Sequence, residues 1–138
     1  MTFLSKTNYV QPAANIATLL FAVVMLLQLL IATGIVPISI AWGGRQTELT
    51  PSLRIASFVA VALLGAFIYI IRYRAGLAGS VPIPVFIKVT SWIVTAFMAF
   101  NTLGNLASLS NVEKILFSPI TFALTIATFI VSASRLEL

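Results

Sequence analysis

Uncharged amides and hydroxyls are the main groups of this chain that could do chemistry within its apolar segments. Asn101, Asn105 and Ser108 recur at i, i+4 and i+7, so a helix would place them on one face, with Gly104 leaving room beside them. An amide in hydrocarbon is costly unless it is hydrogen-bonded, so this face must meet another helix, a loop or water. We expect structural contacts between helices there, with a binding site as the alternative.

A second row of polar side chains lies near the C-terminus. Thr121, Thr125, Thr128 and Ser132 follow a spacing that is typical of one helix face. We expect a packing seam between helices, and the alternative is a polar track for an ion or a small solute. Gln28 lies near the middle of the first apolar segment and is expected to bond to a neighbouring helix. The candidate intramembrane polar cluster therefore consists of Asn101, Asn105, Ser108, Gln28, Thr121, Thr125 and Thr128.

The most polar loop begins at Trp42 and continues through Gly43, Gly44 and Arg45 to Glu48. Successive glycines permit a tight turn with positive φ angles. Arg45 could bind an anionic lipid headgroup, pair with Glu48 or hold a helix end. We expect headgroup contact by Gly43, Gly44 and Arg45. A phosphate-binding glycine loop would need a helix start and a lysine in the right frame, and this loop has neither.

The residue types that are missing exclude most catalytic chemistry. The sequence has no His, no Cys and no Asp, so it offers no imidazole base, no thiol nucleophile and no zinc or iron–sulfur site of the usual kinds. Its three carboxylates, Glu48, Glu113 and Glu137, are expected in loops or the tail. Proton-coupled transport generally needs an ionisable group within the membrane. We therefore predict no enzyme activity, no cofactor and no metal.

The elements that must position these groups are helices in a bilayer. Of the 138 residues, 60% are hydrophobic and 8% are charged, and the mean hydropathy is +1.11. A soluble domain is about one quarter charged. We predict an all-α membrane protein with one domain over residues 1–138, a four-transmembrane-helix bundle with short loops. Its spans are predicted at about 13–36, 51–73, 84–109 and 119–135.

Prolines and caps mark the expected helix starts. Four prolines are each expected near the start of a helix, where the missing amide hydrogen does no harm: Pro12, Pro51, Pro84 and Pro119. Thr50 and Ser118 precede two of these prolines and are expected as N-caps.

The segments that flank the spans carry further predictions. Ser110 and Glu113 fit a capping box, which predicts a short helical turn at 111–117 before the fourth span restarts. Residues 36–42 alternate in polarity and are expected as an extended segment at the membrane surface, anchored by Trp42. The first apolar run is too long for the core of a signal peptide, so we expect it to remain as a span.

The basic residues set the expected orientation and exclude one class of partner. With the N-terminus in the cytoplasm, the basic residues on that side are Lys6, Arg72, Arg74, Lys88 and Arg135. Those on the other side are Arg45, Arg54 and Lys114. This bias favours cytoplasmic N- and C-termini. The net charge of +5 is not gathered on a basic face or block that could follow phosphates, so no nucleic-acid partner is expected.

Several short motifs give the chain a resemblance to known sequences. They are Val36-Pro37-Ile38-Ser39, Trp42-Gly43-Gly44-Arg45, Asn101-Thr102-Leu103-Gly104-Asn105, Glu113-Lys114 and Ser118-Pro119-Ile120-Thr121. With these motifs the chain resembles an uncharacterised family of small bacterial four-span integral membrane proteins. The resemblance implies a four-helix protein of a bacterial plasma membrane, and it implies no activity.

The function predicted from these features depends on contact rather than catalysis. Small and hydroxyl-rich helix faces, short loops and the lack of reactive groups favour a non-enzymatic protein that acts by helix–helix association. It would be a homo-oligomer or an accessory subunit of a membrane complex. The alternatives are a passive channel or carrier with a path lined by Thr and Asn, and a binder of lipid or an apolar ligand. The expected partners are the lipid bilayer and other copies or membrane subunits.

Overall fold

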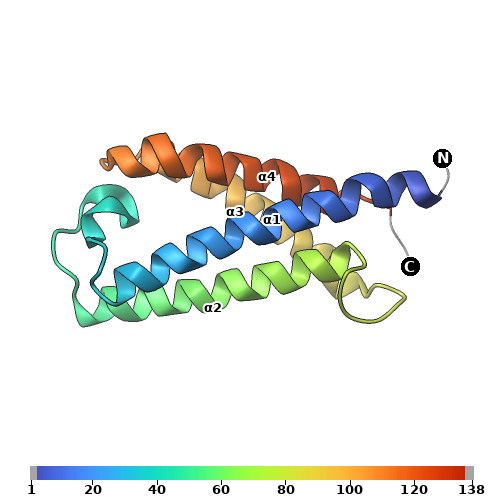
Figure 1. Cartoon of the computed structure of the whole chain (residues 1–138), viewed down its shortest axis with the longest axis horizontal. Helices are drawn as coiled ribbons and strands as arrows, with labels where there is room; N and C mark the ends of the chain where they lie inside the picture. Colours follow the sequence, from blue (N-terminus) through green and yellow to red (C-terminus); the bar gives the residue numbers. More distant parts are fainter. Residues whose placement is uncertain (1–2, 136–138) are drawn as a thin grey trace.

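The fold is that of a computed structural model (Figure 1), which describes residues 3–135, with side chains from residue 8 onward. The four α-helices are α1 (Phe3–Ala32), α2 (Pro51–Arg74), α3 (Val85–Leu106) and α4 (Ser118–Ser132). Three short helical turns lie between them: η1 (Ile38–Ile40), η2 (Trp42–Gly44) and η3 (Glu113–Phe117). The described residues contain no β-strand, so the predicted all-α, four-helix class is confirmed.

Each of the four helices is long and apolar enough to cross a membrane. The candidate spans are Asn8–Ala32, Pro51–Arg74, Val85–Leu106 and Glu113–Ser132. About twenty residues of α-helix rise about 30 Å, which matches the hydrocarbon thickness of a bilayer. Large apolar side chains such as Leu19, Phe86 and Ile126 are exposed on the outer faces. In a bilayer these side chains meet lipid rather than water.

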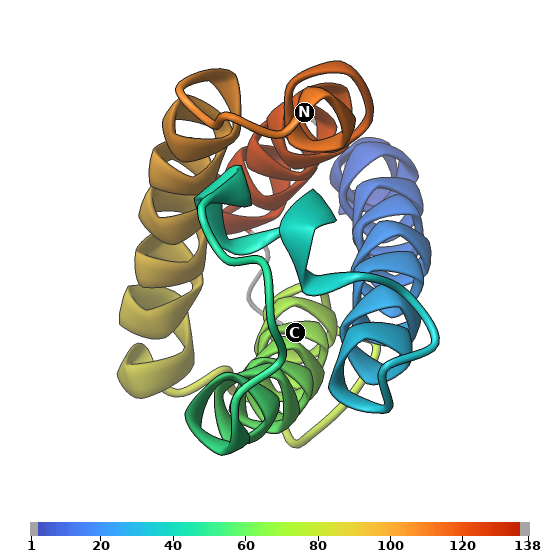
Figure 2. The same ribbon diagram turned by 90° about the vertical axis from the view of Figure 1, so that its left-hand side faces the viewer.

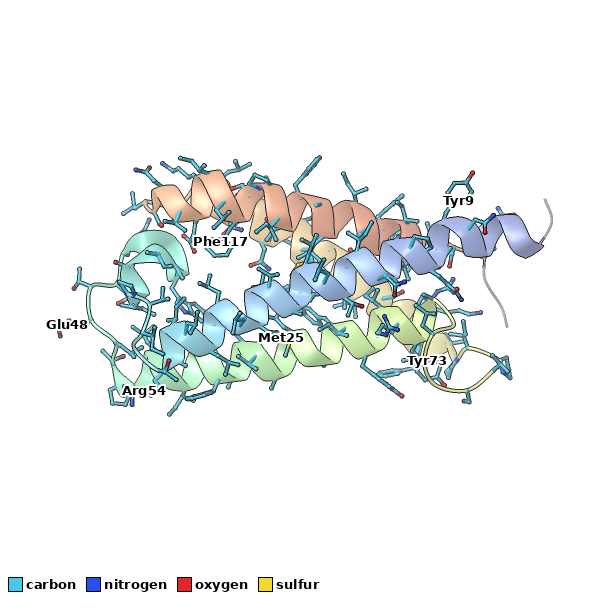
Figure 3. All side chains as sticks on the ribbon, viewed as in Figure 1. Tyr9, Met25, Glu48, Arg54, Tyr73 and Phe117 are labelled. Atoms are coloured by element: carbon cyan, nitrogen blue, oxygen red, sulfur yellow. The ribbon has the colours of Figure 1, made fainter. Side chains whose placement is uncertain are left out.

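The helices form a bundle with two distinct ends. α1 packs closely against α2 and α4, and α3 packs against α4, whereas α2 and α3 meet only sparsely (Figure 2). The 75–84 loop and the ends of the described chain lie at what we call the terminal end, and residues 33–50 and 107–112 lie at the loop end (Figure 1). Figure 3 shows Tyr9 and Tyr73 toward the terminal end, and Glu48 and Arg54 at the loop end.

A tightly packed core fills the bundle toward the terminal end. Ala14 and Ala17 of α1 are fully buried, and their small side chains let neighbouring helices approach closely. The ring of Phe21 meets the ring of Phe67 edge to face, with 5.9 Å between the ring centres. The same core includes Ile71, Val94, Met98, Leu124 and Val131.

Helix α1 differs from its predicted span at both ends. It begins before residue 13 and carries Pro12 in its interior, so the prediction that Pro12 marks a first turn is wrong. A proline there leaves the carbonyl of Asn8 without a helical donor, and Asn8 is exposed. The helix ends at Ala32 because Gly34 adopts a φ of +83° and its amide donates to the carbonyl of Ile31.

The two predicted N-caps have different outcomes. Thr50 caps α2, because its hydroxyl accepts a hydrogen bond from the amide of Leu53 at 3.2 Å. Ser118 is not a cap, since it has helical backbone angles and its hydroxyl donates to the carbonyl of Glu113. η3 is a π-helical turn that leads directly into α4, so the predicted restart at Pro119 is wrong. Proline lacks an amide hydrogen, and the wider π turn accommodates it.

The segment predicted to be extended is instead wound into two short 3-10 turns. η1 and η2 fold across the loop end of the bundle (Figure 2), where Ile38 and Ala41 are buried with Ile31 of α1. Burial of these apolar side chains favours the folded turns over an extended segment lying on the membrane surface.

Candidate functional site

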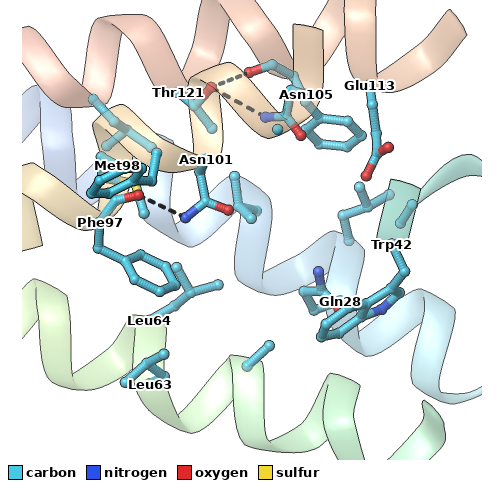
Figure 4. Close-up of a pocket in the computed structure, with 18 of the residues that line it drawn as sticks. Gln28, Trp42, Leu63, Leu64, Phe97, Met98, Asn101, Asn105, Glu113 and Thr121 are labelled. Atoms are coloured by element: carbon cyan, nitrogen blue, oxygen red, sulfur yellow. Dashed lines mark hydrogen bonds between the residues drawn. The ribbon is translucent and has the colours of Figure 1, made fainter. Parts of the chain in front are cut away.

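A cleft of about 730 Å³ lies at the loop end of the bundle, between α2 and α3 (Figure 4). Its other walls come from the second half of α1, the η2 turn and the start of the η3–α4 helix. The space exists because α2 and α3 meet sparsely and because the lining includes Ala56, Ala60 and Gly104. A Cβ atom at Gly104 would have no neighbouring atom within 4 Å.

The walls of the cleft are mainly apolar. Leu63 and Leu64 line it from α2, Phe97 and Met98 from α3, and Phe117 from η3. Leu63 and Phe97 are each 42% exposed although they line the cleft. The cleft is therefore open sideways, toward the hydrocarbon of a surrounding bilayer.

Two of the predicted polar residues of α3 line the cleft. The amide nitrogen of Asn101 donates to the carbonyl of Phe97 at 2.9 Å, and that of Asn105 donates to the hydroxyl of Thr121 at 3.2 Å. Each amide is turned so that its nitrogen meets the protein and its oxygen lies toward the cleft (Figure 4). The two side chains thus supply hydrogen-bond acceptors to the cleft.

Gln28 reaches the cleft from α1 without the partner that the sequence predicted. Its Oε1 atom is buried and accepts no hydrogen bond from any described residue, so the predicted bond to a neighbouring helix is wrong for this atom. The amide nitrogen points toward the cleft (Figure 4). A buried carbonyl without a donor costs about 1–3 kcal/mol. Gln28 is therefore held in an unfavourable environment at this site.

Glu113 is the ionisable residue of the cleft, although the sequence predicts it in a loop. It is 7% exposed, so the prediction that all carboxylates lie in loops or the tail is wrong for this one. Its carboxylate accepts a hydrogen bond from the amide of Gly43 at 3.1 Å and another from the hydroxyl of Ser108. Only half of the predicted capping box forms, since the Glu113 amide donates to the Ser110 hydroxyl at 3.4 Å while the carboxylate turns toward Gly43.

The glycine turn is docked on the protein. Gly43 and Gly44 have φ angles of +81° and +72°, which are the positive angles that the sequence predicts. The amide of Leu109 donates to the carbonyl of Gly43 at 3.0 Å, and a Cβ atom at Gly44 would lie 2.5 Å from the amide nitrogen of Ser110. Both glycines thus contact the connection between α3 and η3. Arg45 is exposed, and its contact with a lipid headgroup stays a prediction.

Trp42 lines the cleft from η2 with a strained backbone. Its φ is +55°, a region that a bulky residue rarely adopts. The indole Nε1 donates to the hydroxyl of Ser57 on α2 at 3.3 Å. The sequence predicts an anchor at the membrane surface, whereas the ring forms part of the cleft wall. Strain of this kind gathers at functional sites, where the surrounding structure must hold it.

The threonine row on α4 divides between the cleft and the α3–α4 contact. Thr121 lines the cleft, whereas Thr125 and Thr128 lie outside its lining. Their hydroxyls donate to the carbonyls of Thr121 and Leu124 on the same helix, at 2.8 Å and 2.7 Å. The Thr125 hydroxyl also lies 3.5 Å from that of Thr102 on α3. Thr125 and Thr128 therefore have the contacts of a packing seam.

Among the described residues, Glu113 is the one charged side chain that lines the cleft. Glu48 is exposed in its loop, and Glu137 lies outside the described residues. Residues 8–135 contain no group of three or more His, Cys, Asp or Glu that could hold a metal ion. Apolar walls with amides and one carboxylate at one end suit a molecule with an apolar body and a polar head.

No family model matches the chain, and neither a curated protein nor a solved structure matches it. The resemblance to small bacterial four-span membrane proteins therefore stays a prediction.

Proposed function

We propose that this chain is a non-enzymatic membrane protein that takes an amphipathic molecule from the bilayer into the cleft between α2 and α3. The observation that supports this most is the cleft of about 730 Å³, with apolar walls and acceptors at one end. Ligand pockets are typically about 300–1,000 Å³ and mostly apolar, with a few polar groups that orient the ligand. The unpartnered carbonyl of Gln28 and the strained backbone of Trp42 lie at the same site.

The position of the cleft supports entry from lipid. The η2 turn lies over its loop end, whereas Val59, Leu63 and Phe100 are exposed along its side. An apolar chain would therefore enter between α2 and α3, leaving its head near Glu113 and Gln28. An amphipathic molecule that is already dissolved in the bilayer reaches such an opening without crossing water.

We place this protein in a bacterial plasma membrane with both termini in the cytoplasm. The basic residues toward the terminal end are Arg72, Arg74, Lys88 and Arg135. Those toward the loop end are Arg45, Arg54 and Lys114. The side chain of Lys6 lies outside the described ones. The excess at the terminal end supports this orientation by the positive-inside rule, and the cleft would then lie in the outer half of the bilayer.

The fluorescence of Trp42 tests the proposal, because Trp42 lines the cleft and the other tryptophan, Trp92, does not. The Trp92 ring lies against Phe129 of α4, and Trp92→Phe keeps an aromatic ring there. In that variant, reconstituted in phosphatidylcholine vesicles, a brominated dodecyl alcohol should quench Trp42. Adding Gly104→Leu fills the cleft from an open position and should strongly reduce the quenching.

Two control variants separate cleft binding from ordinary contact with the probe in lipid. Ala22→Leu adds bulk on an exposed face of α1 outside the cleft, and it should leave the quenching unchanged. Trp42→Phe leaves Trp92 as the fluorophore, and its quenching should not respond to Gly104→Leu. If Trp42 is quenched equally with Gly and with Leu at position 104, the cleft does not bind the probe and the proposal is wrong.

Helix–helix association is the second candidate function, and α2 carries the observation that favours it. Ala62 and Ala66 are exposed one helical turn apart, so a second helix could approach closely there. Gly65 instead faces α1, because a Cβ atom there would lie 3.7 Å from the methyl group of Met25. A chain with both Ala62→Leu and Ala66→Leu should lose any oligomer detected by native mass spectrometry. An oligomer that survives both changes removes this candidate.

A passive channel or carrier has less support. Thr125 and Thr128, which would line its path, lie in the α3–α4 seam rather than in the cleft. The packed core around Phe21 and Ile71 separates the cleft from the terminal end. We therefore favour a binding function over a transport function.

A further inference from the structure

The polar end of the cleft carries hydrogen-bond acceptors and one acidic group, and the amide nitrogen of Gln28 is the donor that points toward it. Asn101 and Asn105 present their side-chain oxygens because their nitrogens bond to the protein. Glu113 adds its carboxylate, and none of the described residues that line the cleft is Lys or Arg. Gln28 can present its oxygen after half a turn of its amide, since Oε1 has no partner to lose.

Glu113 is bonded to neutral groups and retains capacity for another donor. The groups that reach its carboxylate are the Gly43 amide and the Ser108 hydroxyl. A carboxylate offers about four lone-pair positions, and Oε1 receives only the longer contact of 3.4 Å from Gly43. Taking a charge out of water without an opposite charge beside it is unfavourable. A cation in the cleft would offset that penalty.

Aromatic rings surround the same space. Trp42, Phe100 and Phe117 all line the cleft, and Figure 4 shows the Trp42 ring near Gln28 on the side toward which Glu113 points. The face of an aromatic ring attracts a cation, most strongly in tryptophan. An ammonium group in the cleft would therefore have aromatic rings as well as oxygen atoms around it.

From these features we infer that the cleft takes a cationic amphiphile, with its ammonium head at Glu113 and its apolar body along Leu63 and Phe97. This inference rests on the proposed function and names its class of ligand. Asn101 and Asn105 act as further acceptors for the head. A fatty acid or a lipid phosphate would meet a carboxylate there and no basic side chain, so the cleft discriminates against anionic heads.

Competition between amphiphiles of equal chain length tests the inference. The Trp92→Phe protein in phosphatidylcholine vesicles is loaded with the brominated dodecyl alcohol. Dodecylammonium, dodecanol or dodecanoate is then added, and displacement is compared at equal measured mole fractions in the bilayer. Dodecylammonium should restore Trp42 fluorescence at about tenfold lower mole fraction, as expected of one charge-assisted hydrogen bond. Equal displacement by all three would overturn the inference.

Substitution of single carboxylates locates the source of the preference. Glu113→Gln keeps the shape of the side chain and an oxygen that can accept from Gly43, so the alcohol should still quench Trp42. The advantage of dodecylammonium should fall to within about twofold, because the charge-assisted bond is lost. Glu48→Gln removes the same charge from an exposed loop and should keep the advantage. Persistence of the advantage in Glu113→Gln, or its loss in Glu48→Gln, would contradict the assignment.

The two proposals fail in different ways. If Gly104→Leu does not reduce quenching by the neutral alcohol, the cleft does not bind amphiphiles and the proposed function fails. If that quenching is blocked but dodecylammonium has no advantage, the cleft binds amphiphiles without regard to charge, and only the ligand class is wrong.

Discussion

The two ends of the bundle differ in how their polar side chains are bonded. Toward the terminal end, the guanidinium of Arg72 donates to Asn15 at 3.0 Å and to Thr18 at 3.3 Å, which ties α2 to α1. Toward the loop end, Gln28 Oε1 has no hydrogen-bond partner among the described residues. The Ser134 hydroxyl, near the end of the described chain, also has no hydrogen-bond partner within it, but it does not line the cleft, whereas Gln28 does. Gln28 is therefore the residue at which a further molecule in the cleft would complete the bonding.

Packing differs between the two ends in the same direction. A side chain at Gly79 would collide with the ring of Tyr73, whose hydroxyl lies 3.0 Å from that of Ser80. A side chain at Gly104 would meet no atom within 4 Å of its Cβ. The loop end is also tightly packed at Gly44, but unlike the terminal end it keeps an open cleft beside Gly104.

Truncation of one apolar side chain at each end should give the largest difference. Ile71 is fully buried, so Ile71→Ala should lower the free energy of unfolding by about 3 kcal/mol, because its neighbours lose packing contacts. Leu63 is 42% exposed on the cleft wall, and Leu63→Ala should lower it by about 1 kcal/mol or less. Unfolding in mixed micelles with increasing dodecyl sulfate measures both. If both variants lose the same free energy of unfolding, the two ends of the bundle do not differ in packing.

The glycine turn tests whether the cleft depends on a tightly fitted loop. Gly44→Ala places a methyl group against the amide nitrogen of Ser110 in addition to the strain of a φ of +72°, and it should lower the free energy of unfolding by about 2 kcal/mol. Gly34 has a similar φ of +83° with open space around it, so Gly34→Ala should cost about 1 kcal/mol.

Quenching of Trp42 by the brominated alcohol gives a second way to distinguish Gly44→Ala from Gly34→Ala. η2 carries both Trp42 and the Gly43 amide that Glu113 holds, so Gly44→Ala should also weaken quenching of Trp42 by the brominated alcohol. Gly34→Ala should leave it unchanged, because Gly34 does not line the cleft. If Gly44→Ala and Gly34→Ala lose stability and quenching equally, the close approach of Gly44 to Ser110 affects neither the stability of the fold nor the cleft.

Hydropathy predicts the four helices because a bilayer leaves the backbone few alternatives. A long apolar segment in lipid must satisfy its amides and carbonyls internally, and an α-helix does so for each segment independently. The same independence made Asn101 and Asn105 identifiable, since their spacing alone places them on one face of α3. Local rules also predicted the Thr50 cap, whose partner Leu53 is three residues away.

The missed parts of the site depend on contacts between distant segments. Glu113 fits a local capping box, but its carboxylate bonds to Gly43, 70 residues earlier in the chain. Trp42 is positioned by Ser57 of α2 and by the folding of η1 and η2 over the bundle, which no periodic pattern encodes. The π turn before Pro119 was missed because a proline more often marks a helix start.

Gln28→Leu should give a small change in stability and the most informative one. The substitution replaces an unpartnered buried carbonyl with an apolar side chain of similar size, so it should raise the free energy of unfolding by about 1 kcal/mol. It should also weaken displacement of the probe by dodecylammonium, because an acceptor near the head is lost. A residue that only holds the fold would not change stability and binding in opposite directions.

Asn15→Leu is the matched substitution at the terminal end. It removes an acceptor that Arg72 uses, and it should lower the free energy of unfolding by about 1 kcal/mol while leaving probe binding unchanged. The two amide-to-leucine changes should therefore differ in sign, although the residues lie on the same helix. If Gln28→Leu destabilises the protein as Asn15→Leu does, Gln28 has a structural partner just as Asn15 has, and the cleft needs no further molecule to complete its bonding.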